Sequence, residues 1–173
     1  MEGDMNTLEL APGILPADAG KLVHLATLGV RYISRGEQAG GRVAVVEYLT
    51  PPHSLGAPTH THTREDEISV VTEGVVGVQI GDEVYSVGVG GVMFKPRGIP
   101  HAFWNATDAP ARVLEILTPA GFEGYFEEMA ALFADAKGGM PDPQRAGAVL
   151  ATYGLEMDFG SIPVLAQRYG LHI

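Results

Sequence analysis

Two short segments carry most of the chemistry of this chain, and they constrain its fold because their side chains have to meet. The first contains His60, His62 and Glu67, and the second contains His101. Three imidazoles and one carboxylate form a complete set of protein ligands for a divalent transition metal, with room left for water, dioxygen or substrate. A single histidine on a strand is more often a packed core residue, but the set of four predicts a metal site.

The spacing of these residues indicates β-strands. Alternate side chains of an extended strand point to the same face, so His60 and His62 project together. After a turn at residues 63–66, the next strand can return Glu67 to the same interior. A tight turn at residues 96–98 then directs His101 into a further strand. Strands that are separate in the sequence therefore have to converge on one centre.

Short strands bounded by Gly or Pro are predicted throughout residues 21–118. Alternation and β-branched residues place them at residues 21–27, 29–35, 42–49, 67–73, 75–80, 83–87, 92–95, 101–105 and 112–117. Gly81-Asp82 is a hairpin turn signal between two of them. Many short strands with no helix between them indicate an all-β fold, an antiparallel barrel or jelly roll.

The pattern changes after residue 118. Apolar residues at helical spacing predict an amphipathic helix over residues 121–136. Asp142 followed by Pro143 is an N-terminal signal for a second helix that runs to about Tyr153. The tail, residues 155–173, shows no clear period. We therefore divide the chain into an N-terminal arm (1–20), a barrel (21–118) and a C-terminal helical extension packed on the barrel (119–173).

Written as patterns, the two segments are H-x-H-x4-E-x6-G and G-x5-P-x-G-x2-H-x3-N, with fifteen residues between Gly74 and Gly90. This pair resembles the two motifs of the cupin superfamily, and the second matches at every fixed position. One departure concerns Gly56. Three residues lie between Gly56 and the first ligand, whereas the family usually has five there. The resemblance implies one cupin-type β-barrel and one divalent transition metal per chain, either Fe, Mn, Ni, Co or Zn. The ligands that it implies are His60, His62, Glu67 and His101.

Longer segments are similar to the single-domain, quercetin-dioxygenase-type bacterial cupins. They are residues 63–68, 95–103 and 117–126, together with Tyr153-Gly154 and Pro163. This resemblance implies a dioxygenase that acts on a phenolic, flavonol-like or polyketide-like small molecule, with Glu67 also acting as a base toward a bound phenol or enol. Two alternatives stay open: a metal-dependent polyketide cyclase or isomerase that uses no dioxygen, and a non-catalytic protein that binds a small molecule.

An apolar pocket beside the metal would suit a flat aromatic substrate. The candidates for its lining are Phe103, Phe94, Met93 and Ile99. Alternation with His101 favours Phe103 as inward-facing, and Trp104 and Arg97 are then less directly involved. All four candidates are also explained by ordinary core packing. The remaining histidines, His24, His53 and His172, are interpreted as packed or solvated residues.

Composition limits the classes of partner. With 173 residues the chain is expected to form one domain. The absence of cysteine means that nitrogen and oxygen must hold the metal. Twenty-one acidic against eleven basic residues give a net charge of -10, which repels phosphate backbones and disfavours nucleic-acid binding.

Location and assembly are predicted from the same data. The first six residues lack the features of a signal peptide, and no segment has the length of a membrane span, so we expect a cytoplasmic protein with no membrane partner. A hydrophobic content of 46% suggests that an edge strand or face has to be covered. We therefore expect a homodimer, the commonest arrangement that does so.

Overall fold

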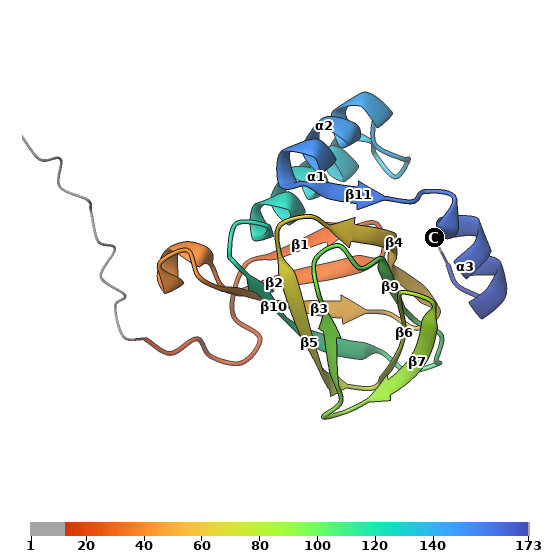
Figure 1. Cartoon of the computed structure of the whole chain (residues 1–173), viewed down its shortest axis with the longest axis horizontal. Coiled ribbons are helices and arrows are strands. Elements are labelled where there is room, and N and C mark those ends of the chain that lie inside the picture. Colours follow the sequence, from red (N-terminus) through yellow and green to blue (C-terminus); the bar gives the residue numbers. More distant parts are fainter. Residues whose placement is uncertain (1–12, 173) are drawn as a thin grey trace, which may run out of the picture.

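The computed structural model describes residues 13–172, which form two antiparallel sheets with three α-helices (Figure 1). The six-stranded sheet has the order β1 (Leu22–Leu25), β2 (Leu28–Ser34), β3 (Ala44–Thr50), β10 (Ala111–Thr118), β5 (Asp66–Glu73) and β8 (Val92–Lys95). The five-stranded sheet has the order β11 (Leu155–Met157), β4 (Ser54–His62), β9 (His101–Asn105), β6 (Val75–Ile80) and β7 (Glu83–Gly88). The predicted all-β jelly roll is confirmed.

Most predicted strands lie within a few residues of those observed. The main difference is β4, which begins at Ser54 and is nine residues long, so it extends well before the two ligand histidines. Residues 1–12 of the expected arm lie outside the described residues. The first six residues, on which the signal-peptide prediction depends, are among them.

The core lies between the two sheets and follows the two-residue period of the strands. In β10, which pairs with both β3 and β5, buried and half-buried residues alternate from Ala111 to Thr118. Three of the four buried positions in β10 are apolar, and the fourth is Glu115. The interior is therefore apolar at most positions and strongly polar at a few.

Both predicted helices are confirmed: α1 spans Glu123–Asp135 and α2 spans Pro143–Tyr153. Asp142 caps α2 by accepting hydrogen bonds from the backbone N–H groups of Gln144 and Arg145. Figure 1 shows α1, α2 and β11 at one end of the barrel, with α3 (Ser161–Tyr169) on the side near the C-terminus.

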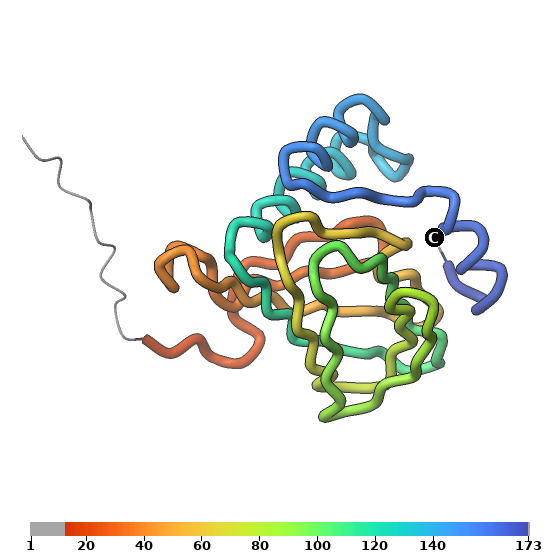
Figure 2. The backbone as a smooth tube through the Cα atoms, viewed as in Figure 1, coloured from red at the N-terminus to blue at the C-terminus, as the bar shows by residue number. Residues whose placement is uncertain are grey.

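The tail that showed no period in the sequence forms β11 and α3. β11 pairs with β4, with Leu155 opposite His62 and Met157 opposite His60. The tube in Figure 2 follows this last part of the chain back across the barrel. The extension thus contributes a strand beside the one that carries two predicted ligands.

The position of Gly56, which departs from the motif, is explained by its neighbour across the sheet. A Cβ atom at Gly56 would overlap the ring of Phe103 on β9. The pairing of β4 with β9 also changes register between Leu55 and Ala57. A glycine is therefore required where the Phe103 ring crosses the backbone of β4.

This packing predicts opposite effects for two glycine substitutions. Gly56→Ala forces an extra methyl group against Phe103, so we expect a loss of about 1–3 kcal/mol in the free energy of unfolding, as for other overpacked sites. Gly147 lies in α2, and a Cβ atom added there would have no neighbouring atom within 4 Å. Gly147→Ala should therefore stabilise the protein by about 0.5–1 kcal/mol. Urea unfolding of both variants measures the two changes, and a neutral or stabilising Gly56→Ala would contradict the account.

Candidate metal centre

The structure brings the four predicted ligands together. His60 and His62 lie at the end of β4, Glu67 is the second residue of β5, and His101 is the first residue of β9. Each offers one ligand atom, and all four atoms lie within 4.8 Å of one another. Their exposed fractions are 7%, 2%, 2% and 1% respectively.

The hydrogen bonds of the histidines set the direction of their lone pairs. Nδ1 of His60 lies 2.7 Å from the carbonyl oxygen of Pro58, and Nδ1 of His101 lies 3.0 Å from that of Ile99. Because a carbonyl oxygen only accepts, both Nδ1 atoms must be the donors. In the neutral ring the lone pair is then on Nε2, the usual arrangement for a histidine that binds a metal.

Two acceptor atoms consequently face each other inside the protein. Nε2 of His101 lies 2.9 Å from Oε2 of Glu67, and within residues 13–172 both atoms are buried without a hydrogen bond of good geometry. A proton between them would give a structural ion pair. Burial, the largest effect, lowers the pKa of His101 despite the attraction of Glu67, which favours the neutral ring. A cation bound to both atoms would satisfy both lone pairs.

The separations fit a single divalent cation. Donor atoms about 2.0–2.2 Å from one metal lie about 3 Å apart when they are neighbours in its coordination sphere. Nε2 of His62 lies 3.3 Å from Oε1 of Glu67, close to this value, as is the 2.9 Å between His101 and Glu67. A site made of imidazole and carboxylate suits Fe, Mn, Co, Ni or Zn. His60, His62, Glu67 and His101 would hold the ion.

Glu67 also forms an ion pair with a buried lysine. Nζ of Lys95 lies 2.8 Å from Oε2 of Glu67, and the lysine is only 3% exposed. Burial raises the pKa of Glu67, but the charge of Lys95, the largest opposing effect, helps to hold the pKa well below its usual value. Glu67 is therefore anionic, as a metal ligand must be.

The buried polar group continues deeper into the barrel. Nζ of Lys95 lies 3.0 Å from Oε2 of Glu115, which also accepts a 2.7 Å hydrogen bond from the hydroxyl of Ser69. Burial raises the pKa of Glu115 to about 7, against the opposing charge of Lys95. The sequence analysis missed Lys95, Ser69 and Glu115, although Glu115 interrupts an apolar face of β10.

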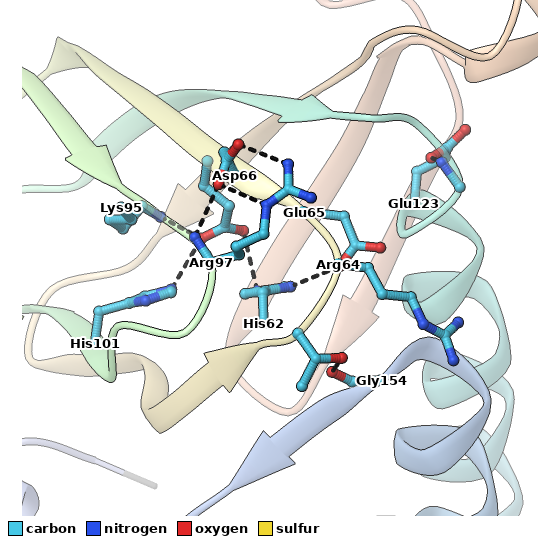
Figure 3. Close-up of polar contacts among 12 residues, drawn as sticks. His62, Arg64, Glu65, Asp66, Lys95, Arg97, His101, Glu123 and Gly154 are labelled. Atoms are coloured by element: carbon cyan, nitrogen blue, oxygen red, sulfur yellow. Dashed lines mark hydrogen bonds and ion pairs between the residues drawn. The ribbon is translucent and has the colours of Figure 1, made fainter.

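The C-terminal extension covers one side of the centre. The ring of Phe122, just before α1, packs edge-on against His62 at 4.3 Å between centroids. The turn after β4 is tied to the end of α2, because Arg64 donates to the carbonyl of Thr152 and Thr63 to that of Gly154. Figure 3 shows Arg64 and Gly154 on the same side of the centre as His62. This extension therefore helps to hold the end of β4 that carries His62.

The predicted pocket residues fall into two groups. Phe103 and Met93 are buried, and Phe103 stacks on Tyr48 with 5.2 Å between ring centroids. Phe94 is 65% exposed, because the alternation in β8 places Met93 and Lys95 inside. Ile99 is 39% exposed, and it contributes its carbonyl to His101. Phe94 and Ile99 therefore lie at the surface, and their place in a substrate pocket stays a prediction.

The residues assigned a minor role lie away from the centre. Arg97 is paired with Asp66 at the surface, at 2.7 Å, and Trp104 is stacked against Tyr169 of α3. Nε2 of His53 contacts Asp108 at 2.7 Å in an exposed position.

Comparison with known proteins agrees with this geometry. Residues 46–117, from β3 to β10, match the family described as "Cupin domain", and this span contains all four ligands. No curated protein is significantly similar in sequence.

Solved structures with a similar fold come from several organisms. KdgF from Halomonas sp. is 13% identical over 66% of this chain and 99% of that chain, with a TM-score of 0.58. An RmlC-like cupin from Shewanella frigidimarina is 14% identical over 64% of this chain and 93% of that chain, with a TM-score of 0.55. The chain spans 60% of a cupin-superfamily sugar phosphate isomerase from Silicibacter pomeroyi, at 26% identity over 54% of this chain, with a TM-score of 0.49.

The first two likenesses show a cupin fold, and together with the domain match they support the cupin superfamily. They do not define the reaction, since one fold carries many activities. Among the described residues, no helix is both long and apolar enough to cross a membrane.

We predict that the protein binds one metal ion per chain and retains it in mildly acidic solution. Burial, followed by the neighbouring His101 and His62, lowers the pKa of His60 well below its usual value, and burial lowers that of His101. Protons compete with the metal only near the pKa of the ligand, so a lowered pKa moves metal release to lower pH. We expect the midpoint of release below about 6.5, the value for free histidine.

Elemental analysis after dialysis at graded pH measures this release. His60→Ala and His101→Ala should abolish stoichiometric metal, whereas His53→Ala at the surface should retain it. A wild-type protein that holds no metal after metal-replete purification, or releases it at or above pH 6.5, would be inconsistent with the site.

Proposed function

We propose that this chain, whose residues 46–117 match the cupin domain, is a metal-dependent dioxygenase of the quercetin-dioxygenase type that acts on a phenolic, flavonol-like or polyketide-like small molecule. The observation that carries the proposal is the buried set of three imidazoles and one carboxylate. Four protein ligands leave coordination positions free for small molecules.

The bound metal would act as a Lewis acid that lowers the pKa of a phenol or enol and provides a position for dioxygen. Glu67 then serves as the proton acceptor. Its low pKa makes it a weak base toward an ordinary hydroxyl, so it suits a substrate hydroxyl that has already been acidified. The carboxylate is anionic and held in place by Lys95, which keeps an acceptor oxygen in a constant position beside the metal ligands.

The neighbouring residues are suited to a flat apolar guest. Phe103 and Tyr48 form a stacked pair in the interior, and Met93 is buried on the opposing sheet. Phe122 packs against His62 and reduces the access of water from the side of the extension. An aromatic substrate would contact these surfaces by stacking and dispersion.

The alternative is a metal-dependent cyclase or isomerase. The observation that favours it is the position of Glu67, because a fixed anionic carboxylate beside a Lewis acid supports proton transfer without any oxidant. A non-catalytic binding protein would bind a small molecule at the same centre without turnover. The three functions differ in whether dioxygen is consumed and whether product forms.

We predict oxygen uptake when the metal-reconstituted protein is mixed with flavonols or related polyphenols. Glu67→Gln removes the proton acceptor while keeping the shape and one oxygen donor, so turnover should fall by about a hundredfold or more. His62→Ala should remove metal and activity together. Glu73→Gln, the same change at an exposed position of β5, is the matched control and should leave activity unchanged.

An oxygen electrode combined with product analysis distinguishes the candidate functions. Turnover of phenolic or polyketide substrates without oxygen uptake would replace the dioxygenase with the cyclase or isomerase. Tight binding without any product would support the binding protein.

We also propose that two copies of the chain associate. The edge strands β7 and β8 expose apolar side chains, including Tyr85, Val92 and Phe94. Light scattering should give the mass of two 18.3 kDa chains, and the mass of one chain across micromolar concentrations would reject the dimer. The cytoplasmic location stays a prediction.

A further inference from the structure

Lys95 occupies an unusual place for a lysine. It is the last residue of β8, an edge strand, and its side chain points into the barrel with only 3% of the residue exposed. Glu67 lies directly opposite it on β5. The ammonium group therefore lies within the protein and beside a predicted metal ligand (Figure 3).

Two carboxylates hold this ammonium group from different strands. Nζ lies 2.8 Å from Oε2 of Glu67 on β5 and 3.0 Å from Oε2 of Glu115 on β10. Ser69 donates a 2.7 Å hydrogen bond to the same oxygen of Glu115, so Glu115 is itself fixed. The chain of contacts from Ser69 through Glu115 and Lys95 ends on the carboxylate of Glu67.

The ammonium group of Lys95 would weaken metal binding if its only effect on the metal were electrostatic repulsion. Like charges in a low-dielectric interior repel strongly, and an ammonium 2.8 Å from a ligand oxygen is close to the cation. An apolar residue at position 95 would place no positive charge near the metal and would not repel it. A lysine is therefore expected only if its contacts with Glu67 compensate for this repulsion.

We propose that Lys95 is a positioning residue, which fixes the carboxylate of Glu67 in the orientation that binds the metal, and that Glu115 holds Lys95 in place for this purpose. The ammonium restrains Oε2, and Oε1 stays directed toward His62, whose Nε2 is 3.3 Å away. The inference rests on the metal centre of the proposed function and is independent of the reaction catalysed there.

The proposal and a pure charge effect predict opposite results for Lys95→Met. This substitution keeps a long side chain in the cavity and removes the charge and the hydrogen-bond donors. If Lys95 acts only by repelling the cation, the variant binds metal more tightly. If Lys95 positions Glu67, the variant binds about 10–100-fold more weakly, as is typical when a partner of a metal ligand is removed.

The experiment uses Co2+ alone as the probe, added to metal-free full-length protein. Titration calorimetry gives the dissociation constant, and the visible d–d absorption of the saturated protein reports the arrangement of the ligands. We expect weaker binding by Lys95→Met and a changed d–d spectrum at saturation, because Glu67 is no longer held in one orientation.

Two further variants separate positioning from folding. Lys95→Met leaves Glu115 without its buried partner, so the metal-free protein can lose stability. The double variant Lys95→Met/Glu115→Gln removes that uncompensated carboxylate and should recover much of the thermal stability without recovering Co2+ affinity. Glu115→Gln alone keeps Lys95 but loosens its support, and should weaken Co2+ binding less than Lys95→Met.

The outcomes are distinguishable. Unchanged or tighter Co2+ binding by a folded Lys95→Met or double variant, with the wild-type spectrum, overturns the positioning role and leaves the metal centre intact. Wild-type protein that fails to bind Co2+ overturns the metal centre, and the positioning role with it. Recovery of both stability and affinity in the double variant would show that Lys95 acts only through folding.

Discussion

The structure depends on one contact: the lone pairs of His101 and Glu67 face each other at 2.9 Å in a buried place, where both could bind one cation. Without one, Nε2 of His101 would be desolvated without a donor, and the carboxylate of Glu67 would depend on Lys95 for compensation. Strands β4, β5 and β9 meet at this point, and each supplies predicted ligands from a different part of the chain. Backbone carbonyls of Pro58 and Ile99 then orient the imidazoles so that the donor atoms converge.

The same interior contains more charge than its metal ligands require. Glu115 and Lys95 are buried beside these ligands, and each partly compensates the charge of the other. This group links β10 and β8 to the metal-binding end of β5. On the opposite side, β11 pairs with β4, and Phe122 packs on His62, so the C-terminal extension acts as a support for the centre.

The ligands were predictable because their signal is local: His60 and His62 differ by two residues, which places them on one face of any strand. The second helix was predictable for a similar reason, since Asp142 and Pro143 are strong start signals. The exposure of Phe94 was not predictable because in a four-residue strand either parity is plausible, and the partner strand decides it. β11 and α3 were missed because β11 has three residues and exists through its pairing with β4, while α3 begins without a side-chain cap. The roles of Lys95 and Glu115 depend on their contact with each other. The sequence pattern does not show that their strands, β8 and β10, lie close enough for this contact.

X-ray absorption at the metal edge of the Co2+-loaded protein tests the central claim most directly, that one cation is bound by these four side chains. The account predicts a single metal environment of nitrogen and oxygen donors at about 2.0–2.2 Å, with the multiple scattering of three imidazole rings. It also predicts that His101→Ala, which loses stoichiometric metal, no longer gives this spectrum. A spectrum of hydrated Co2+ without imidazole scattering, or one that is unchanged in His101→Ala, would contradict it.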